Sequence, residues 1–384
     1  MAMRPETRAV HSGVYQDQTF NSVTTPIYPS STFYFDKVGV NKGYDYTRSA
    51  NPTRDALEQN IASLEGGAGA VATATGMAAV TTTLALLGAG SHVIAGRDIY
   101  GGSYRLFSQI LPRLGIEFSF IDMRDPADVD AAVRNNTKMI WIETPSNPLL
   151  NITDIEAVAA VARRRGVMTA ADNTFLSPIH QRPLEWGVDL VVHSTTKYIN
   201  GHSDVVGGAI VGRTADLAEQ LNALANAIGT TGSPFDAWLV LRGVKTLPQR
   251  MAAHQHNAAA LATYLQQHPR VNKVYYTGLP DHSQAPLIEK QQSGHGGMLA
   301  FDLDAPADKL DDFFAALKLI TLAESLGGVE SLIEQPWTMS HASMGEAGLA
   351  ASGITPQTLR VSVGLEHPDD LLEDFERGFA AVSG

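Results

Sequence analysis

Short apolar runs alternate with helix-like stretches along the middle of the chain. The apolar runs span five or six residues each and occupy positions 92–96, 118–123, 138–143, 167–172, 188–193 and 208–212. Nearly continuous apolar character is typical of strands that are covered on both faces. A helix expected over 153–166, with a capping box of Thr153 and Glu156 and a stop at Gly166, is one of the intervening elements. The alternation predicts an open, mostly parallel α/β sheet.

An extended arm and a helix are expected before these runs. Residues 1–45 contain Pro26 and Pro29 within an apolar and aromatic stretch, which argues against a regular helix there. Pro52 suits the first turn of the helix that follows. Because the arm is too apolar to stay in water, we expect it to pack against another subunit.

The pattern changes after about residue 245. Long helical periods are followed by two segments, 296–303 and 359–364, in which polar and apolar residues alternate as they do in a sheet with one exposed face. This change predicts a second, smaller domain of the α+β class. The expected division is therefore an arm at 1–45, an α/β domain at 46–245 and a C-terminal α+β domain at 246–384.

Charge and composition narrow the range of functions. The chain has 28 Lys and Arg against 40 Asp and Glu, and the resulting net charge of −12 is scattered rather than clustered. We therefore expect neither nucleic acid nor a membrane as a partner. The absence of cysteine excludes disulfides and a cysteine nucleophile, and no metal site is expected. An apolar leader and an apolar stretch of about eighteen residues are both missing, which predicts a cytoplasmic protein.

One strand-like run ends in hydroxyl groups around a single lysine. Residues 189–208 read DLVVHSTTKYINGHSDVVGG, with Lys197 just beyond the expected strand. Most lysines are ordinary surface residues. Open α/β sheets, however, bind ligands at the carboxyl ends of their strands, and the hydroxyls of Ser194 and Thr196 suit phosphate oxygens. Lys197 is therefore a candidate for a Schiff base with a carbonyl cofactor.

Three further features fit pyridoxal phosphate, which needs an acid at its ring nitrogen, an anion site and a group that holds its ring. Asp172 ends the run that precedes the one leading to Lys197, although it equally suits a turn cap. A helix expected to begin at Gly76–Met77 offers N–H groups to a phosphate, or is simply a helix start. Tyr100 follows the run 92–96 and either stacks on a ring or lies at a rim.

The chain resembles a known family over nearly its whole length. The likeness is carried by YTRSANPTRDALEQNIASLEGGAGAVATATGMAAV, YGGSYRLF, ETPSNPLL, DNTFLSP, HSTTKYINGHSDVVGG and AESLGGVES. These stretches are similar to those of the Cys/Met-metabolism family of pyridoxal-phosphate enzymes. The resemblance implies an aspartate-aminotransferase-like fold (fold type I), pyridoxal 5'-phosphate as the cofactor, small amino-acid substrates and a homotetramer built of two active dimers.

The resemblance also implies roles for individual residues. Lys197 would carry the cofactor, Asp172 would pair with the ring nitrogen, and Tyr100 would stack on the ring and transfer protons. Further cofactor contacts are implied for Gly76, Met77, Asn147, Ser194 and Thr196. Tyr46 and Arg48 would complete the phosphate site of the neighbouring subunit. Substrate contacts are implied for Arg48, Tyr100, Arg105, Asn147, Glu324, Ser325 and Arg360.

The residues themselves support one of these substrate contacts. Leu359, Val361 and Val363 share one face of an expected strand, so that Arg360 points the other way. An arginine in that position suits either a bidentate grip on a carboxylate or a surface ion pair.

Within the family, the sequence resembles most closely the branch that acts at the γ-carbon. We expect cysteine to displace the succinate or acetate of O-succinyl- or O-acetylhomoserine and so to form cystathionine. The γ-elimination of cystathionine to cysteine, 2-oxobutanoate and ammonia is the alternative. By the resemblance, a glutamate at the position of Glu324 is typical of the γ-acting enzymes, although a glutamate there also suits a helix start. Arg105 suits the extra carboxylate of a succinyl group. A relative that only binds would be expected to lack Lys197 or Asp172, and both are present.

Overall fold

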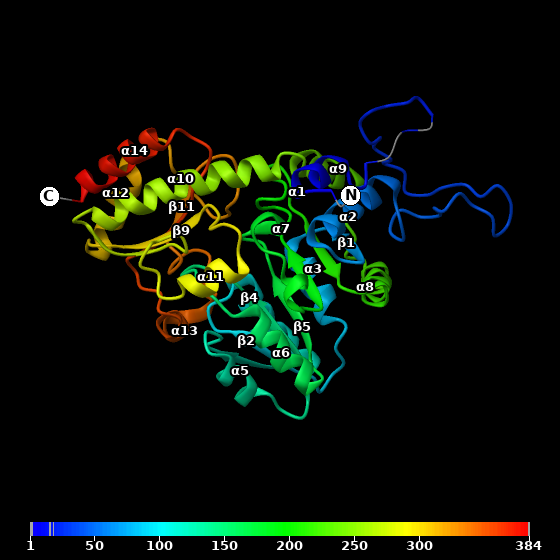
Figure 1. Ribbon diagram of the computed structural model, residues 1–384, viewed down its shortest axis with the longest axis horizontal. Coiled ribbons are helices and arrows are strands. Elements are labelled where there is room, and N and C mark those ends of the chain that lie inside the picture. Colours follow the sequence, from blue (N-terminus) through cyan, green and yellow to red (C-terminus); the bar gives the residue numbers. More distant parts are fainter. Residues whose placement is uncertain (1–2, 15–16, 18, 383–384) are drawn as a thin grey trace. The chain divides into compact units, whose positions relative to one another are not determined.

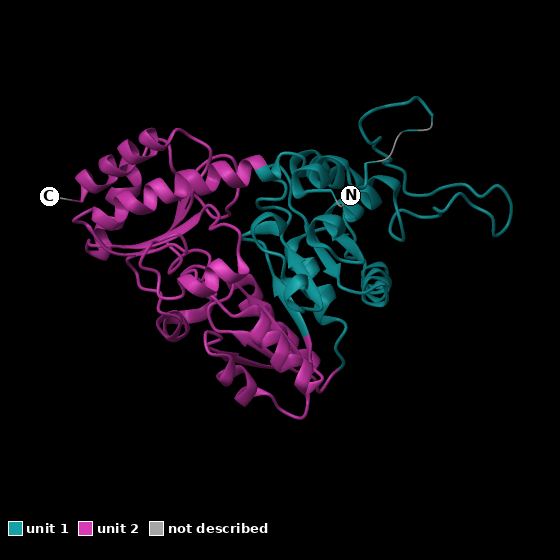
Figure 2. Cartoon of the chain, viewed as in Figure 1, with its two compact units in different colours: residues 1–88, 169–248 teal, residues 89–168, 249–384 magenta. Residues whose placement is uncertain are grey.

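The computed structural model describes residues 3–14, 17 and 19–382, and the chain divides into two compact units (Figure 1 and Figure 2). Unit 1 comprises residues 1–88 and 169–248, and unit 2 comprises residues 89–168 and 249–384. One of these divisions, after residue 248, lies near the change of pattern in the sequence. The three-part division itself stays a prediction, and residues 1–2, 15–16 and 18 of the expected arm lie outside the described residues.

Unit 1 contains strands of the larger sheet in the order β1-β7-β6-β5. Strand β1 (Gly69–Thr73) is antiparallel to β7 (Gly208–Gly212), β7 is antiparallel to β6 (Leu190–His193), and β6 is parallel to β5 (Met168–Asp172). The helices are α1 (Pro5–His11), α2 (Pro52–Glu65), α3 (Gly76–Leu84), α7 (Ser177–His180), the 3₁₀ turn η3 (Pro183–Trp186), α8 (Ala215–Ile228) and α9 (Pro234–Val244).

The first segment of unit 2 contains strands in the order β4-β2-β3. Strand β2 (His92–Gly96) is parallel to both β3 (Glu117–Ile121) and β4 (Thr137–Glu143). The helical elements of this segment are α4 (Gly101–Arg105), η1 (Leu106–Ile110), η2 (Leu111–Leu114), α5 (Pro126–Ala132) and α6 (Ile155–Arg165).

The second segment of unit 2 forms a smaller, mixed sheet in the order β10-β11-β12-β9-β8. Its strands are β8 (Val271–Tyr275), β9 (Met298–Leu303), β10 (Thr321–Leu322), β11 (Leu332–Glu334) and β12 (Thr358–Ser362). Its helical elements are α10 (Leu247–Gln267), α11 (Ala285–Gln291), η4 (Ala307–Lys309), α12 (Leu310–Ala316), η5 (Ala342–Met344), α13 (Gly345–Ser352) and α14 (Pro368–Ala381). Helices α10, α12 and α14 pack against this sheet around Phe301, Phe313, Phe375 and Phe379 (Figure 1).

Most of the expected elements are present. All six apolar runs coincide with strands to within about two residues, and α2 begins at Pro52 and ends before Gly66, whose φ of 77° is left-handed. The capping box was wrong: Asp154, not Thr153, caps α6, because its side chain accepts the N–H of Ala157. The half-exposed faces expected at 296–303 and 359–364 were also wrong, since β9 is buried except for the partly buried Asp302 and every residue of β12 is buried.

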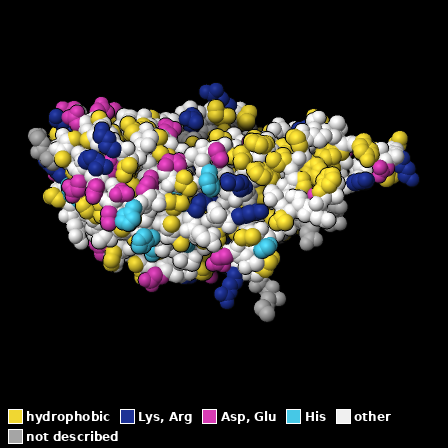
Figure 3. Space-filling model, turned by 90° about the horizontal axis from the view of Figure 1, so that it is seen from above, with side chains coloured by type: hydrophobic (Ala, Val, Ile, Leu, Met, Phe, Trp, Pro, Cys, Tyr) yellow, Lys and Arg dark blue, Asp and Glu magenta, His cyan; other side chains and the backbone are white. Residues whose placement is uncertain are grey.

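The arm exposes large apolar side chains. Phe20, Val23, Tyr34 and Val38 are at least 80% exposed, with little of the chain folded over them. Helix α1 lies within the arm, whereas residues 19–45 form an irregular loop of unit 1 (Figure 1), and hydrophobic side chains gather at the right of Figure 3. Exposed apolar residues in this number suit a surface that another protein covers. Among the described residues, no helix has the length and apolar character that crossing a bilayer requires.

Candidate active site

Two parallel strands of unit 1 place Asp172 and the loop of Lys197 at the same sheet edge. Asp172 is the last residue of β5 and pairs with Val192, the third residue of β6. Thr174 links the two strand ends, because its N–H donates to Asp172 Oδ1 (3.0 Å) and its hydroxyl accepts the N–H of Ser194 (2.9 Å). Asp172 therefore caps a turn, which is the alternative role that the sequence suggested for it. It also lies at the carboxyl ends of the strands, where open sheets bind ligands.

The turn after β6 fixes the backbone of Lys197. Its N–H donates to Ser194 O (3.2 Å), and its carbonyl accepts the N–H of Gly201 (2.8 Å). The hydroxyl of Thr196 accepts the N–H of Gly207 (2.9 Å) and donates to the carbonyl oxygen of Gly207 (3.2 Å). The hydroxyl of Thr196 therefore already has hydrogen-bond partners within the loop. Lys197 is partly exposed.

The start of α3 lies against this turn. Thr75 caps the helix by accepting the N–H of Ala78 (2.8 Å), and the helix begins at Gly76, as predicted. A Cβ on Gly76 would lie 2.8 Å from Cβ of Ser194, so only glycine permits this approach. The first N–H groups of a helix have no partner within it and attract anions, so that Gly76, Met77 and Ser194 suit a phosphate group.

Asp172 is subject to opposing electrostatic effects. Burial raises the pKa of its carboxyl, while the hydrogen bonds from Thr174 and the charge of His193 oppose this rise. A carboxylate here would pair favourably with a cationic ring nitrogen, which would favour its ionised form. We call Gly76, Met77, Asp172, Ser194 and Lys197 the cofactor group.

Tyr46 and Arg48 are not brought to the cofactor group of their own chain. Both are exposed, and the guanidinium of Arg48 lies 5.6 Å from the centre of the Tyr46 ring. Arg48 Nη1 donates to the backbone oxygen (2.6 Å) and to Oδ1 (2.9 Å) of Asn226 in α8. These contacts leave open a role of the two residues at another subunit.

Arg360 of β12 is the centre of a buried network in unit 2. It is 3% exposed; its Nη1 lies 3.2 Å from Asn147 Oδ1, and its Nη2 lies 2.8 Å from the carbonyl oxygen of Ser325. Its neighbours Leu359 and Val361 belong to the core on the other face, as the alternation predicted. Arg360 Nε has no hydrogen-bond acceptor among the described residues, so that a donor remains for a further anion.

Sequence reasoning missed two partners in this network. Glu334 forms a buried ion pair with Arg360 Nη1 (3.0 Å) and accepts the hydroxyl of Ser340. His341 is fully buried, and its Nε2 lies 3.1 Å from the carbonyl oxygen of Asn147. Burial, followed by the charge of Arg360, lowers the pKa of His341 to about 3. Glu334 follows two apolar residues, Leu332 and Ile333, and no local pattern indicates its pairing with Arg360.

Tyr100 lies at the start of α4 and is 41% exposed. This exposure agrees with the alternative that Tyr100 lies at the rim of a site. Its N–H donates to both carboxylate oxygens of Glu143 (3.1 Å each). A Cβ on Gly102 would lie 2.4 Å from the Tyr100 ring, so the absence of a side chain there makes room for it. We call Tyr100, Asn147, Ser325 and Arg360 the substrate group.

Charged side chains of unit 2 act on the Tyr100 hydroxyl. Burial raises its pKa; Arg105 and Arg360 oppose the rise, and Glu324 and Glu334 add to it. Arg105 and Glu324 are both exposed. Glu324 lies in the loop after β10 and does not begin a helix, which removes that alternative.

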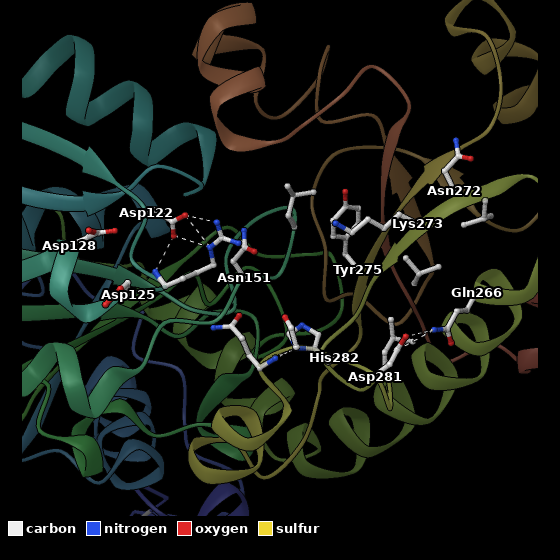
Figure 4. A pocket seen from close by; sticks show the side chains of 17 residues that line it. Asp122, Asp125, Asp128, Asn151, Gln266, Asn272, Lys273, Tyr275, Asp281 and His282 are labelled. Carbon is white, nitrogen blue, oxygen red and sulfur yellow. Dashed lines mark hydrogen bonds and ion pairs between the residues drawn. The ribbon is translucent and has the colours of Figure 1, made fainter.

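A cavity of about 810 Å³ in unit 2 lies apart from these residues (Figure 4). It is lined by side chains of the α5 region, β8 and the following loop, and it includes no residue predicted for the active site. Its polar groups pair with one another or with their neighbours: Arg124 with Asp122, Gln266 with Asp281, and Tyr275 with Asp302. Cavity size therefore does not identify the chemistry in this protein.

Known proteins similar to this chain share one cofactor chemistry. The family profile described as Cys/Met metabolism PLP-dependent enzyme matches residues 6–380. A cystathionine β-lyase of Coxiella burnetii is 49% identical over 97% of this chain and 96% of its own, and a cystathionine γ-lyase of Bacillus subtilis is 45% identical over 97% and 98%. A cystathionine γ-synthase of Xanthomonas oryzae pv. oryzae, solved with aminoacrylate and cysteine, is 48% identical, with a TM-score of 0.97 over 100% of this chain and 99% of its own. The predicted fold class is thereby confirmed.

Proposed function

Because the chain belongs to the Cys/Met-metabolism family of pyridoxal-phosphate-dependent enzymes, we propose that it catalyses a γ-replacement in which cysteine displaces the carboxylate leaving group, succinate or acetate, of an O-acylhomoserine to give cystathionine. The cofactor is pyridoxal 5'-phosphate, and the chemistry is that of the transferases and lyases of cystathionine metabolism. The observation that carries the finer assignment is the pair Arg105 and Glu324, two exposed opposite charges that both act on Tyr100.

The cofactor group suits this cofactor. The N–H groups of Gly76 and Met77 with the hydroxyl of Ser194 would hold the phosphate, and the backbone approach at Gly76 keeps that position clear. Asp172 would face the ring nitrogen, where a cation would counter the rise of its pKa that burial causes. Lys197 would hold the cofactor through its amine. Tyr100 would pack against the ring and transfer a proton at its hydroxyl.

When bound, the cofactor stabilises negative charge at the substrate carbon from which a proton is removed. The amine of Lys197 is the base that we assign to this step, because its long side chain can reach first Cα and then Cβ. Asp172 supports the step by staying ionised next to the ring nitrogen. Removal of both protons prepares the γ-carbon: its bond to the ester oxygen would break with release of the carboxylate, and the sulfur of cysteine would form the new C–S bond. Protons would then return to Cβ and Cα, so that no net proton is lost from these carbons.

Arg360 would bind the α-carboxylate of the substrate. Its Nη groups are oriented by Asn147 and by the carbonyl of Ser325, and its Nε donor is available. Because Glu334 compensates part of its charge, the empty site is not left with an unpaired buried cation. The substrate carboxylate would then be held by directed hydrogen bonds rather than by net charge alone.

The distal part of the substrate would be recognised by charge. Arg105 suits the second carboxylate of a succinyl group, which an acetyl group lacks. Glu324 suits the ammonium group of the incoming cysteine or of the distal half of cystathionine. The same two residues would also accept cystathionine itself, and γ-elimination of cystathionine is therefore the second candidate activity.

The quaternary structure and the cellular location belong to the same proposal. Tyr46 and Arg48, at the end of an arm with exposed apolar residues, would complete the phosphate site of a neighbouring subunit in a homotetramer of two active dimers. The cytoplasmic location expected from the sequence likewise stays a prediction.

Product analysis tests the proposed reaction. The holoenzyme is incubated with O-succinylhomoserine, with and without cysteine, and separately with cystathionine. We expect cystathionine from the first mixture, and 2-oxobutanoate in its place when cysteine is omitted. Pyruvate from cystathionine, without any γ-replacement, would assign a β-elimination and contradict the proposal.

A variant of Arg105 tests the acyl preference. Arg105→Ala should raise the KM for O-succinylhomoserine and leave that for O-acetylhomoserine unchanged, because only the succinyl ester carries the second carboxylate. The exposed Arg113, in η2 of the same unit, provides a matched control as Arg113→Ala. Equal KM changes for both esters would remove Arg105 from the acyl site.

A further inference from the structure

One carboxylate in unit 1 contacts the two strand ends that bear the cofactor group. Glu65, the last residue of α2, is fully buried. Its Oε1 accepts Nδ2 of Asn173 (2.9 Å) and lies 2.5 Å from Nε2 of His193. Asn173 directly follows Asp172 in the chain, and His193 directly precedes Ser194. A single oxygen atom therefore contacts both sides of the sheet edge where Asp172 and Ser194 lie.

The other contacts make this arrangement rigid. The side chain of Asn173 also donates to the carbonyl of Gln181 (2.7 Å) and accepts from Nε2 of Gln181 (3.0 Å), and its backbone N–H donates to Val192 O (3.0 Å). The structure leaves at most 2% of the surface of Asn173, Gln181 and His193 exposed. We call Glu65, Asn173, Gln181 and His193 the Glu65 network.

Stability is a weak explanation for this network. A buried ion pair costs desolvation and is often replaced by apolar side chains without loss of stability. Here Glu65 Oε2 and His193 Nδ1 also have no hydrogen-bond partner among the described residues, which adds to the cost. Burying this network costs stability, and its residues directly adjoin the cofactor group in the chain. This combination suggests that the network serves the cofactor site.

We propose that Glu65 is a positioning residue of the cofactor site, acting through Asn173 and His193 on Asp172 and on the turn from Ser194 to Lys197. The proposal rests on the assignment of Asp172 and Ser194 to the cofactor under the proposed function. Glu65 touches neither cofactor nor substrate in this account; it fixes the residues next to those that do.

Electrostatics support the same proposal. The charge of His193 opposes the rise of the Asp172 pKa that burial causes. Glu65 Oε1 lies 2.5 Å from His193 Nε2, and both side chains are fully buried. Loss of the carboxylate would disturb the place of Asp172 and would leave His193, whose charge favours the ionised form of Asp172, without its partner. Supporting groups behind ligand residues commonly change affinity by about ten- to hundredfold.

The test measures cofactor binding rather than turnover. Cofactor is removed from the full chain and titrated back while the visible absorption band is followed. Glu65→Gln keeps the size and an acceptor oxygen but removes the charge, and Glu65→Ala removes both. We expect the dissociation constant to rise about tenfold in Glu65→Gln and further in Glu65→Ala, with a shift of the visible band. His193→Gln should give the same shift, and the double variant should not add to it.

A matched control lies on the same helix. Glu58 lies in an ion pair with Arg54 Nε at 3.4 Å, is partly buried, and accepts the N–H of Ala72 (2.9 Å). Glu58→Gln removes a carboxyl group from α2 two turns earlier. It should change the melting temperature of the apoprotein and leave the dissociation constant and the visible band of the cofactor unchanged.

Three outcomes would overturn the proposal, and they are distinguishable. If both Glu65 variants bind the cofactor as wild type does while Asp172→Asn binds it more weakly, only the role of Glu65 is wrong. If Asp172→Asn also binds normally, the assignment of the cofactor site fails, and the proposal fails with it. A Glu65→Gln variant with a lower melting temperature but an unchanged band and dissociation constant assigns the network to stability alone.

Discussion

The cofactor group of unit 1 and the substrate group of unit 2 are built in different ways. In the cofactor group, the decisive positions are strand and helix ends: Asp172 ends β5, Ser194 follows β6, and Gly76 begins α3. The substrate group depends on side-chain contacts between residues distant in sequence, such as Arg360 with Asn147 and with Glu334. The first kind of site follows from backbone topology, and the second depends on a buried network of charges.

This difference predicts different responses to substitution. Changes in the cofactor group should affect the spectrum and the affinity of the cofactor together with turnover. Changes in the substrate group should leave the bound cofactor intact and act on substrate binding, or on stability where a buried charge loses its partner. The predictions below test this separation.

The largest effect is expected for Lys197→Ala. The lysine lies in a turn and is partly exposed, so its loss should cost little stability. Turnover should nevertheless fall to the detection limit, and the visible band of the bound cofactor should disappear. Absorption spectra, initial rates and thermal unfolding of the same samples check this. Near-normal turnover of the folded variant would remove Lys197 from the mechanism.

Asp172→Asn should follow. The amide keeps the shape and an acceptor for Thr174 but cannot carry the negative charge that faces the ring nitrogen. We expect turnover to fall by about a hundredfold or more, with the cofactor still bound but more weakly. Single-turnover rates with saturating cofactor separate the two effects. If the rates match those of wild type, another acid serves the ring nitrogen.

Arg360→Lys tests the substrate group. Lysine keeps the positive charge near Glu334 but lacks the planar fork that grips a carboxylate in two places. Loss of charged hydrogen bonds of about 1.5–3 kcal/mol predicts that kcat/KM falls about ten- to hundredfold, mainly through KM. The visible band of the cofactor should stay unchanged. A loss of cofactor instead would break the separation of the two groups.

Arg48→Ala is expected to weaken cofactor binding by about tenfold, because a guanidinium–phosphate pair is lost at the neighbouring site. Asn226→Ala provides the control, since it removes the partner of Arg48 within its own chain. It should leave cofactor affinity unchanged. If the control weakens the cofactor equally, Arg48 acts by supporting its own chain.

Subunit mixing makes this prediction sharper. Arg48→Ala and Lys197→Ala are each defective at both sites of a symmetric dimer. In a mixed dimer, both substitutions would fall in one active site and the other site would be intact. At equal ratio about half of the dimers are mixed, so activity should recover to about a quarter of wild type. Demonstrated subunit exchange without recovery would show that Arg48 serves its own chain.

The smallest effect concerns His341 and pH. Its pKa is lowered to about 3 by burial and by Arg360, while an unfolded histidine titrates near about 6.5. The unfolded state therefore takes up a proton first as the pH falls, and stability that is complete above about pH 6.5 is lost progressively towards pH 3. His341→Gln should be less stable at pH 7, but should lose about 2 kcal/mol less between pH 7 and 5. Denaturant titrations at both pH values measure this, and parallel losses would contradict it.

The same contrast explains what could be predicted from the sequence. The strand ends at Asp172 and His193 and the helix start at Gly76 follow from local patterns of apolar residues, glycine and hydroxyl groups, and they were predicted correctly. Two members of the network around Arg360 could not be predicted, because Glu334 reaches Arg360 and His341 reaches the carbonyl of Asn147 only through tertiary packing. The exposure expected at β12 was wrong for this reason: its second face is covered by that network instead of by water.

The Glu65 network shows the same limit within the cofactor group. Glu65 is the last residue of α2, yet nothing local indicates that its carboxylate reaches Asn173 and His193, more than a hundred positions away in the sequence. Local patterns place the residues that face a ligand at a sheet edge. The buried side chains that hold those residues become visible only in the folded chain.

The most direct test of the central claim is to locate the cofactor chemically. Reduction of the holoenzyme with borohydride fixes a carbonyl cofactor to the lysine amine that holds it, and peptide mass spectrometry then identifies that lysine. We predict that the pyridoxyl label lies on Lys197, in the peptide that follows β6, and that Asp172→Asn retains it there. Label on another lysine, or none on a chain that binds the cofactor, would contradict the account.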